Sequence, residues 1–203
     1  MAADLNPVEL VDRSFYFIIG FSFLFLFAIT AVMIWFVIRY RRSRNPVPSD
    51  IRGNGWLELA WTVIPSLIAV AMFVSGWQAY MGLRTVPDGA MEIKGYAQSF
   101  SWIFVYPNDA ETENELVVPE GVPIKLTLTS EDVLHSFFLP SFRVKIDAVK
   151  GMETHAWFFP EKRGEYVFHC TEFCGVGHSD MDGMLKILPP KEYEAYLETL
   201  EDE

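Results

Sequence analysis

One short segment near the end of the chain gathers several side chains that bind soft metal ions. Two thiols, an imidazole and a thioether lie within one loop, and these are soft or borderline ligands of the kind that copper favours. A further imidazole, His135, lies thirty-five residues before the first cysteine. The segment therefore predicts a copper site, and it reads His169-Cys170-Thr171-Glu172-Phe173-Cys174-Gly175-Val176-Gly177-His178-Ser179-Asp180-Met181.

The number of cysteines indicates how many ions this site holds. A mononuclear blue-copper site uses one Cys, two His and a weakly bound Met, so a second Cys would be surplus. Two thiolates can instead bridge two copper ions, with His135 and His178 as terminal ligands and with Met181 and a backbone carbonyl between the cysteines as weak ligands. Such a pair shares one unpaired electron, so little reorganisation opposes electron transfer. We therefore expect an electron relay, held rigidly by the surrounding scaffold.

Other interpretations of the same residues stay open. Cys170 and Cys174 could form a disulfide in an oxidising compartment, although this leaves His135, His178 and Met181 unexplained. Two Cys and two His could hold zinc, or the residues could belong to an ordinary core. Two further histidines, His155 and His169, are not needed to complete the site, and we expect them to be surface or structural residues.

Two long uncharged runs precede this region and predict membrane spans. Residues 14–38 and 59–83 contain no Asp, Glu, Lys or Arg, and 51% of the whole chain is hydrophobic. Each run is long enough as a helix to cross a hydrocarbon core of about 30 Å. Buried core helices are usually shorter, and a cleaved signal peptide fits poorly because arginines rather than small residues follow the first run. We expect a transmembrane helical hairpin over residues 1–84.

The loop between the two spans indicates the orientation of the chain. It is rich in arginine, and clustered arginines beside membrane spans favour the cytoplasmic side. We therefore expect both termini and the domain formed by residues 85–203 on the periplasmic side of a bacterial inner membrane. This domain holds 22 Asp and Glu against 9 Lys and Arg, a net charge of −13 with His neutral. Such a field repels nucleic acid and attracts cationic proteins, although acidic surfaces also keep exported domains soluble.

The outer domain shows the two-residue alternation of β-strands. The clearest example is the segment 122–129, and five further strands are expected at 91–106, 134–139, 152–159, 164–169 and 184–188. Strands without intervening helices favour a small antiparallel sandwich or barrel. After Pro190, Tyr193, Tyr196, Leu197 and Leu200 recur at helical spacing, which predicts a short amphipathic helix.

Three separated motifs resemble subunit II of cytochrome c oxidase, which carries the dinuclear copper centre CuA of haem-copper oxygen reductases. They are Glu58-Leu59-Ala60-Trp61-Thr62-Val63-Ile64-Pro65 at the second span, Glu131-Asp132-Val133-Leu134-His135-Ser136-Phe137-Phe138-Leu139-Pro140 around the first histidine, and the cysteine loop. The resemblance covers nearly the whole chain. It implies two transmembrane helices, then an all-β cupredoxin-like Greek-key domain with a short C-terminal helix.

The resemblance also implies roles for particular residues. It makes His135, Cys170, Cys174, His178 and Met181 side-chain ligands, with Glu172 offering its backbone carbonyl to one copper. The carboxylate of Glu172 would point to a magnesium ion at the boundary with the catalytic subunit. Glu58 matches a family glutamate at the mouth of a proton-uptake channel; alternatively, it is an acid stabilised at a helix N-terminus.

The chain departs from the family pattern at two places. The family has two tryptophans in the aromatic stretch, and the first is where electrons usually enter; here Phe100 occupies that position and Trp102 remains. Electrons would therefore enter by Phe100, by Trp102 or by another route. The usual Pro-Gly-Arg is replaced by Lys150-Gly151-Met152, which affects one expected contact with the catalytic subunit.

The function that the resemblance implies is electron transfer within a respiratory oxidase. A cytochrome c, or a cytochrome c domain, would reduce the copper pair, which would pass the electron to haem in subunit I for oxygen reduction coupled to proton pumping. No Cys-x-x-Cys-His occurs in the sequence, so we expect a separate donor protein. The alternatives are the CuA subunit of a nitric oxide reductase and a membrane-anchored copper-delivery protein; the quinol-oxidase branch lacks the copper ligands. Membrane lipid and other oxidase subunits are further expected partners.

Overall fold

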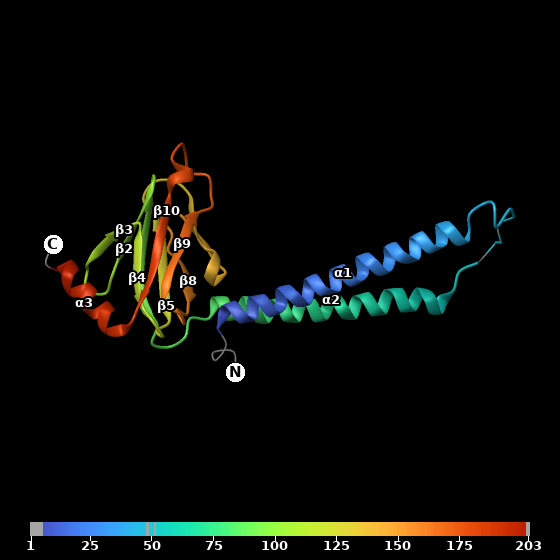
Figure 1. Cartoon of the computed structure of the whole chain (residues 1–203), viewed down its shortest axis with the longest axis horizontal. Coiled ribbons are helices and arrows are strands. Elements are labelled where there is room, and N and C mark those ends of the chain that lie inside the picture. Colours follow the sequence, from blue (N-terminus) through green and yellow to red (C-terminus); the bar gives the residue numbers. More distant parts are fainter. Residues whose placement is uncertain (1–5, 48, 51, 202–203) are drawn as a thin grey trace. The chain divides into compact units, whose positions relative to one another are not determined.

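A computed structural model describes residues 6–47, 49–50 and 52–201 of the chain (Figure 1). Residue contacts divide the chain into two compact units, and each is described separately. One unit is Val11–Ala79, and the other is Tyr80–Glu203 together with the beginning of the first helix. The predicted boundary between residues 84 and 85 falls at the end of the second helix and stays a prediction.

Two long helices contain the predicted membrane spans. Helix α1 covers Pro7–Arg39 and helix α2 covers Gly55–Arg84, and both are long and apolar enough to cross a membrane. They run as a hairpin (Figure 1), in which the Ser14 hydroxyl donates to the Ser75 carbonyl at 3.0 Å. The most apolar stretches of both helices are unburied, so their side chains require lipid or partner helices as neighbours.

The remaining unit is a sandwich of two five-stranded sheets followed by a helix. One sheet has the order β3-β2-β1-β5-β8 and the other has the order β4-β10-β9-β6-β7. The strands are β1 (Met91–Gln98), β2 (Ser101–Val105), β3 (Glu111–Glu113), β4 (Glu115–Pro119), β5 (Ile124–Ser130), β6 (His135–Leu139), β7 (Val144–Ala148), β8 (Thr154–Phe158), β9 (Gly164–Cys170) and β10 (Asp182–Leu188). Two short 3-10 helices, η1 (Pro140–Phe142) and η2 (His178–Asp180), and helix α3 (Pro190–Glu201) complete the described elements.

The core lies between the two sheets and is rich in aromatic rings. Trp102, Phe104, Phe137 and Phe168 are fully buried and meet mostly edge to face, with ring centroids between 4.9 and 6.5 Å apart. Such large buried rings contribute most of the apolar area that a small sandwich can remove from water. This aromatic core lies directly beneath the strand ends that carry the predicted ligands.

The structure confirms the sandwich and the C-terminal helix but corrects the strand prediction. The segment 91–106 is not one strand: it turns at Ser99 and Phe100 and forms the antiparallel hairpin of β1 and β2. The expectation of a purely antiparallel arrangement is also wrong, because β1 pairs with β5 and β4 pairs with β10 in parallel. Strands β3, β4 and β7 were not predicted. In β4 four consecutive residues are buried, so the strand shows no alternation.

Candidate metal centre

The predicted ligands meet at one end of the sandwich because of the strand register. In the antiparallel pair of β6 and β9, Phe137 lies opposite Cys170, so His135, two residues away on the same face of β6, lies beside Cys170. The Cys170 amide donates to the Met181 carbonyl at 3.0 Å, which places the start of β10 beside the end of β9. The loop between β9 and β10 carries Cys174 and His178. The structure thus brings together residues that are far apart in the sequence.

Six candidate donor atoms converge at this point. The two sulfurs, Cys170 Sγ and Cys174 Sγ, are 3.9 Å apart. The ring nitrogen His135 Nδ1 is 3.9 Å from Cys170 Sγ, and His178 Nδ1 is 3.5 Å from Cys174 Sγ. Met181 Sδ is 3.8 Å from Cys174 Sγ, and the backbone oxygen of the residue between the cysteines, Glu172 O, is 3.3 Å from Cys170 Sγ.

The chemistry of this donor set fits soft metal ions. Ligand atoms of His135, Cys170 and Cys174 all lie within 4.8 Å of one another, close enough to surround metal in their midst. Both cysteines are free thiols in the structure, and no disulfide joins them. Thiolate, imidazole and thioether together suit copper, whereas a structural zinc site has no use for the thioether of Met181.

Burial is uneven across the cluster. His135 and Met181 are fully buried, and Cys170 is 6% exposed. Cys174 and His178 are half-buried, and beside them Phe173 and Val176 are 79% and 99% exposed. One side of the cluster therefore faces the core, whereas the other side reaches the surface through the loop.

The thiol of Cys174 is un-ionised at neutral pH in the metal-free protein. Desolvation and the neighbouring Cys170 sulfur raise the pKa of Cys174 to about 11. A bound metal ion must therefore displace a proton from this sulfur, since the thiolate is the ligand form.

Asp132 orients His135, and this role was not predicted from the sequence. Its Oδ1 is 2.8 Å from His135 Nε2, and its Oδ2 accepts the Ser99 amide at 2.7 Å. Partial burial alone would raise the pKa of Asp132, but the hydrogen bonds with Ser99 and His135 hold it well below its usual range. The ionised carboxylate holds the proton of His135 on Nε2, so that Nδ1 is directed to the sulfurs as an acceptor. The available sequence signal was an aspartate three residues before the predicted ligand.

Phe100 lies against the metal-binding loop, which needs glycine at two positions. A Cβ at Gly177 would lie 2.5 Å from Phe100 Cδ2, and one at Gly175 would lie 3.0 Å from Phe100 Cζ. Gly175 also has φ of 136°, a conformation that other residues rarely adopt. The ring and the two glycines therefore fix the path of the loop between Cys174 and His178.

The other predicted site residues occupy different places. Trp102 is fully buried behind His135, with the two ring centroids 6.2 Å apart, and its Nε1 has no hydrogen-bond partner. Glu58 lies in the first turn of α2, after the cap formed by Asn54 Oδ1, which accepts the Leu57 amide at 3.2 Å. Their suggested roles in electron and proton transfer stay predictions.

The two remaining histidines lie outside the cluster of donor atoms. His169 is adjacent to Cys170, but its Nδ1 lies 2.8 Å from Asp182 Oδ1, where the side chain is partly exposed. His155 lies on β8, in the sheet that does not carry the donor atoms.

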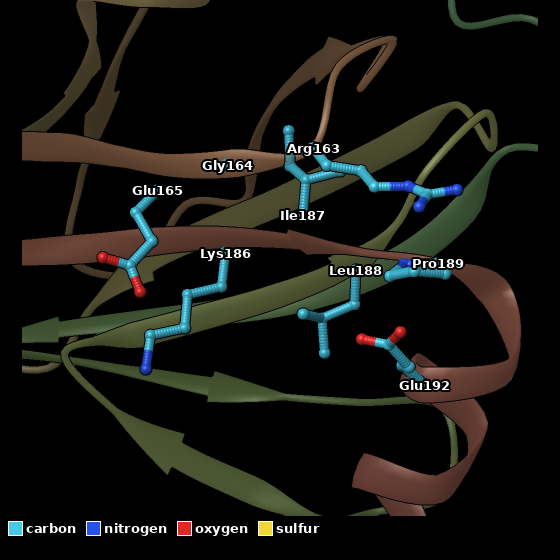
Figure 2. Close-up of a pocket in the computed structure, with 8 residues that line it drawn as sticks. All are labelled: Arg163, Gly164, Glu165, Lys186, Ile187, Leu188, Pro189 and Glu192. Carbon is cyan, nitrogen blue, oxygen red and sulfur yellow. The ribbon is translucent and has the colours of Figure 1, made fainter.

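A surface pocket shown in Figure 2 is distinct from this cluster. It lies where β9 begins and β10 ends, so the length of the strands separates it from Cys170 and Met181. Its two cations have acidic partners: Arg163 Nε is 2.7 Å from Glu120 Oε2, and Lys186 pairs with Glu115. The eight lining residues are Arg163, Gly164, Glu165, Lys186, Ile187, Leu188, Pro189 and Glu192.

Comparisons with known proteins find matches to both parts of the chain. The family described as cytochrome c oxidase subunit II, periplasmic domain, matches residues 91–188, and its transmembrane domain matches residues 5–77. A probable cytochrome c oxidase subunit 2 of Rickettsia bellii is 27% identical over 89% of this chain and 76% of its own length. Cytochrome c oxidase subunit 2 of Alkalihalophilus pseudofirmus is 33% identical over 88% of this chain, which spans only 55% of that relative.

A solved structure shows the same fold in the outer domain. The periplasmic domain of subunit II of cytochrome oxidase (CoxB) of Bradyrhizobium japonicum is 31% identical, with a TM-score of 0.56. The similarity covers 58% of this chain and 98% of that domain. The cupredoxin-like sandwich that the sequence predicted is therefore confirmed.

Replacing Asp132 with alanine should weaken metal binding without removing a ligand. Asp132→Ala removes the acceptor for His135 Nε2, and such losses typically cost about 10- to 100-fold in metal affinity. Competition for copper between the full-length chain and a chelator measures the effect. The matched control is Asp88→Ala, an exposed aspartate in the segment between α2 and β1. Equal copper retention by both variants would show that Asp132 does not position the ligand.

The contact between Gly177 and Phe100 predicts that a second substitution, at Phe100, reverses the effect of a substitution at Gly177. Gly177→Ala places a methyl group against the ring and should cost about 1–3 kcal/mol while altering the visible absorption of the copper-loaded chain. The double variant Gly177→Ala/Phe100→Ala removes the clash and should recover the parental spectrum. If the double variant is as perturbed as the single one, the loop is not fixed by this contact.

Proposed function

The chain belongs to the family of cytochrome c oxidase subunit II, and from this premise we propose that it is the electron-transfer subunit of a terminal respiratory oxidase. One observation carries the proposal: two thiols, two imidazoles, a thioether and a backbone carbonyl converge at one end of the sandwich. Relatives of the chain are named as subunits of cytochrome c oxidase, an oxidoreductase complex.

The six candidate ligands would hold two copper ions, as the CuA centre of the family. Cys170 and Cys174 would supply the thiolates, and His135 and His178 would bind through Nδ1, the nitrogen that faces the sulfurs. Met181 and the carbonyl of Glu172 would be the weak ligands, because a thioether and a backbone oxygen bind copper less strongly than thiolate and imidazole. When bound, the copper pair supplies a carrier for one electron whose charge both ions share.

The protein's contribution to electron transfer is to keep the ligands fixed. Hydrogen-bonded strands hold Cys170, Met181 and His135, so these side chains move little when the charge of the site changes. The aromatic core behind His135 excludes water from the buried side. The exposed side, with Phe173 and Val176, offers a surface for the donor.

The partners follow from the family and from the charge of the domain. We propose that a cytochrome c, or a cytochrome c domain, docks at the outer domain, whose net charge is −13. The electron then passes to haem in the catalytic subunit I, where oxygen is reduced and protons are pumped. A magnesium ion would bind the carboxylate of Glu172 at the boundary with that subunit, and Glu58 would serve proton uptake.

The proposed location is the bacterial inner membrane, with both termini and the metal centre on the outer side. The two apolar helices and the matched transmembrane family domain support a membrane protein. The arginines between the helices support the orientation, because Arg39, Arg41, Arg42 and Arg44 lie at the end of α1 and directly after it.

The ligand assignment predicts which histidine is needed for turnover. His178→Ala in the assembled oxidase should abolish copper loading and oxygen consumption, since it removes a terminal ligand. The matched control is His169→Ala, because His169 adjoins Cys170 but pairs with Asp182 outside the cluster. Normal oxygen consumption by the His178 variant would refute the assignment. If the parental complex consumes nitric oxide instead of oxygen, the chain is a subunit of a nitric oxide reductase of the same architecture and not of an oxidase.

Electrostatic docking predicts a steep salt dependence. The rate of electron transfer from a cationic cytochrome c should fall as ionic strength rises, because salt screens the attraction to the acidic domain. Glu131→Gln, in the loop that leads to His135, should lower the low-salt rate by about two- to fivefold. Glu194→Gln on α3 is the control and should change it less. A flat salt profile would indicate a tethered donor or a donor that docks by apolar contacts.

A further inference from the structure

Four arginines lie where α1 ends and the loop to α2 begins (Figure 1). Arg39 is the last residue of α1, where a cation stabilises the negative end of the helix dipole. Arg41, Arg42 and Arg44 lie beyond the helix, so the dipole does not account for them. All four arginines are exposed. The three that follow the helix are therefore candidates for binding an anion.

These three arginines are held by a tight turn over residues 41–45, which we call the arginine turn. The Arg41 carbonyl accepts the Arg44 amide at 2.9 Å and the Asn45 amide at 3.0 Å. The Asn45 side chain donates from Nδ2 to the Arg39 carbonyl at 2.7 Å, which ties the turn to the end of α1. A turn of this kind brings the Cα atoms of its first and fourth residues within about 7 Å of each other. Arg41 and Arg44 can therefore reach one anion together.

The loop offers little acidic charge to compensate the arginine turn. Residues 39–58 contain five arginines, and their only acidic residues are Asp50 and Glu58. Within the described parts of the chain, no carboxylate forms an ion pair with the arginine turn. Glu58 lies in the first turn of α2, where its Oε1 would be 3.2 Å from a Cβ at Gly53. The arginine turn therefore presents net positive charge that favours an anion.

Aromatic rings beside the arginine turn indicate its depth in the membrane. The uncharged run of the first span ends at residue 38, directly before Arg39. The exposed rings of Trp35, Phe36 and Tyr40 form a cluster with centroids 5.0 to 6.3 Å apart. The guanidinium carbon of Arg39 lies 5.4 Å from the centre of the Tyr40 ring. Because Trp and Tyr are enriched where hydrocarbon meets water, the arginine turn lies at the depth of lipid headgroups.

We propose that the arginine turn binds the headgroup phosphate of an anionic phospholipid in the adjacent leaflet, which is the cytoplasmic leaflet in the proposed orientation. Arg41 and Arg44 present planar guanidinium groups, each of which can form two hydrogen bonds with phosphate oxygens. The aromatic cluster on the last turns of α1 provides apolar surface for the acyl chains, so the site suits an amphiphile better than a free phosphate. Basic clusters directly after a membrane span attract anionic lipids, whereas the cationic group of a zwitterionic headgroup is repelled.

The experiment counts the lipids retained by the full-length chain. The chain is reconstituted in vesicles of equal parts phosphatidylcholine and phosphatidylglycerol, released into detergent and analysed by native mass spectrometry. We expect the parental chain to retain phosphatidylglycerol in preference to phosphatidylcholine. Prior incubation with inorganic phosphate should not lower this retention, because phosphate has no acyl chains to contact the aromatic cluster.

Two variants of the arginine turn test the assignment. The glutamine variant, Arg41→Gln/Arg42→Gln/Arg44→Gln, should lower phosphatidylglycerol retention by about 10- to 100-fold. The lysine variant, Arg41→Lys/Arg42→Lys/Arg44→Lys, keeps the charge that orients the hairpin, so it stays informative if the glutamine variant does not insert. It should lower retention by about two- to tenfold, because an ammonium group does not form the paired hydrogen bonds of a guanidinium.

The matched control removes the same charge from the outer domain. Lys94→Gln/Lys162→Gln/Lys191→Gln changes three exposed lysines that lie outside the loop between α1 and α2. This variant should retain phosphatidylglycerol as the parental chain does, because its arginine turn is intact.

Three outcomes would overturn the proposal. The first is equal retention of the two lipids by the parental chain, and the second is displacement of phosphatidylglycerol by inorganic phosphate. The third is that the variants of the arginine turn retain as much phosphatidylglycerol as the control; if they also lose the catalytic subunit on purification, the turn is a contact between subunits. Lipid retention is measured without reference to copper or turnover, so it is independent of the proposed electron transfer.

Discussion

Two sulfur atoms 3.9 Å apart are the feature on which the rest of the structure depends. One belongs to Cys170 at the end of a strand, and the other belongs to Cys174 in the loop that follows. Neither is oxidised to a disulfide, and each has an imidazole nitrogen within 4 Å. A pair of thiolates so close together repel each other, so the ionised form needs positive charge between them. The arrangement therefore suits metal binding, and the proposed pair of copper ions would use the second cysteine, which a mononuclear site would leave unused.

The strand pairing of the sandwich brings together candidate ligands that are distant in the sequence. The register of β6 with β9 brings His135 to Cys170, and the link from Cys170 to Met181 fixes the two ends of the loop. Phe100, from the turn of the other sheet, lies against Gly175 and Gly177 and limits how far the loop can move. The same arrangement leaves His178 half-buried near the surface while His135 is enclosed. This asymmetry suits a relay that receives an electron at its exposed side.

The sequence predicted the elements whose signals are local. Uncharged runs identified both long helices, and the residue types in the cysteine loop identified Cys170, Cys174, His178 and Met181 as candidate ligands. The prediction failed where the signal depends on distant partners. The segment 91–106 reads as one alternating run, but Ser99 turns toward Asp132, which accepts its amide, and the run becomes a hairpin. Strand β4 is buried at four consecutive positions because elements pack on both of its faces, β2 of the other sheet and helix α3, and no local pattern encodes these contacts. Asp132 was likewise missed, since its role depends on the fold that directs it to His135.

The most direct test of the proposed relay is the number of copper ions that share one electron in the full-length chain. The purified chain in detergent is loaded with copper, its metal content is measured, and its electron spin resonance spectrum is recorded. We expect two copper ions per chain and a signal split by two equivalent copper nuclei. One copper ion per chain with a signal split by a single nucleus, or a bond between Cys170 and Cys174 in the active oxidase, would contradict the proposed relay.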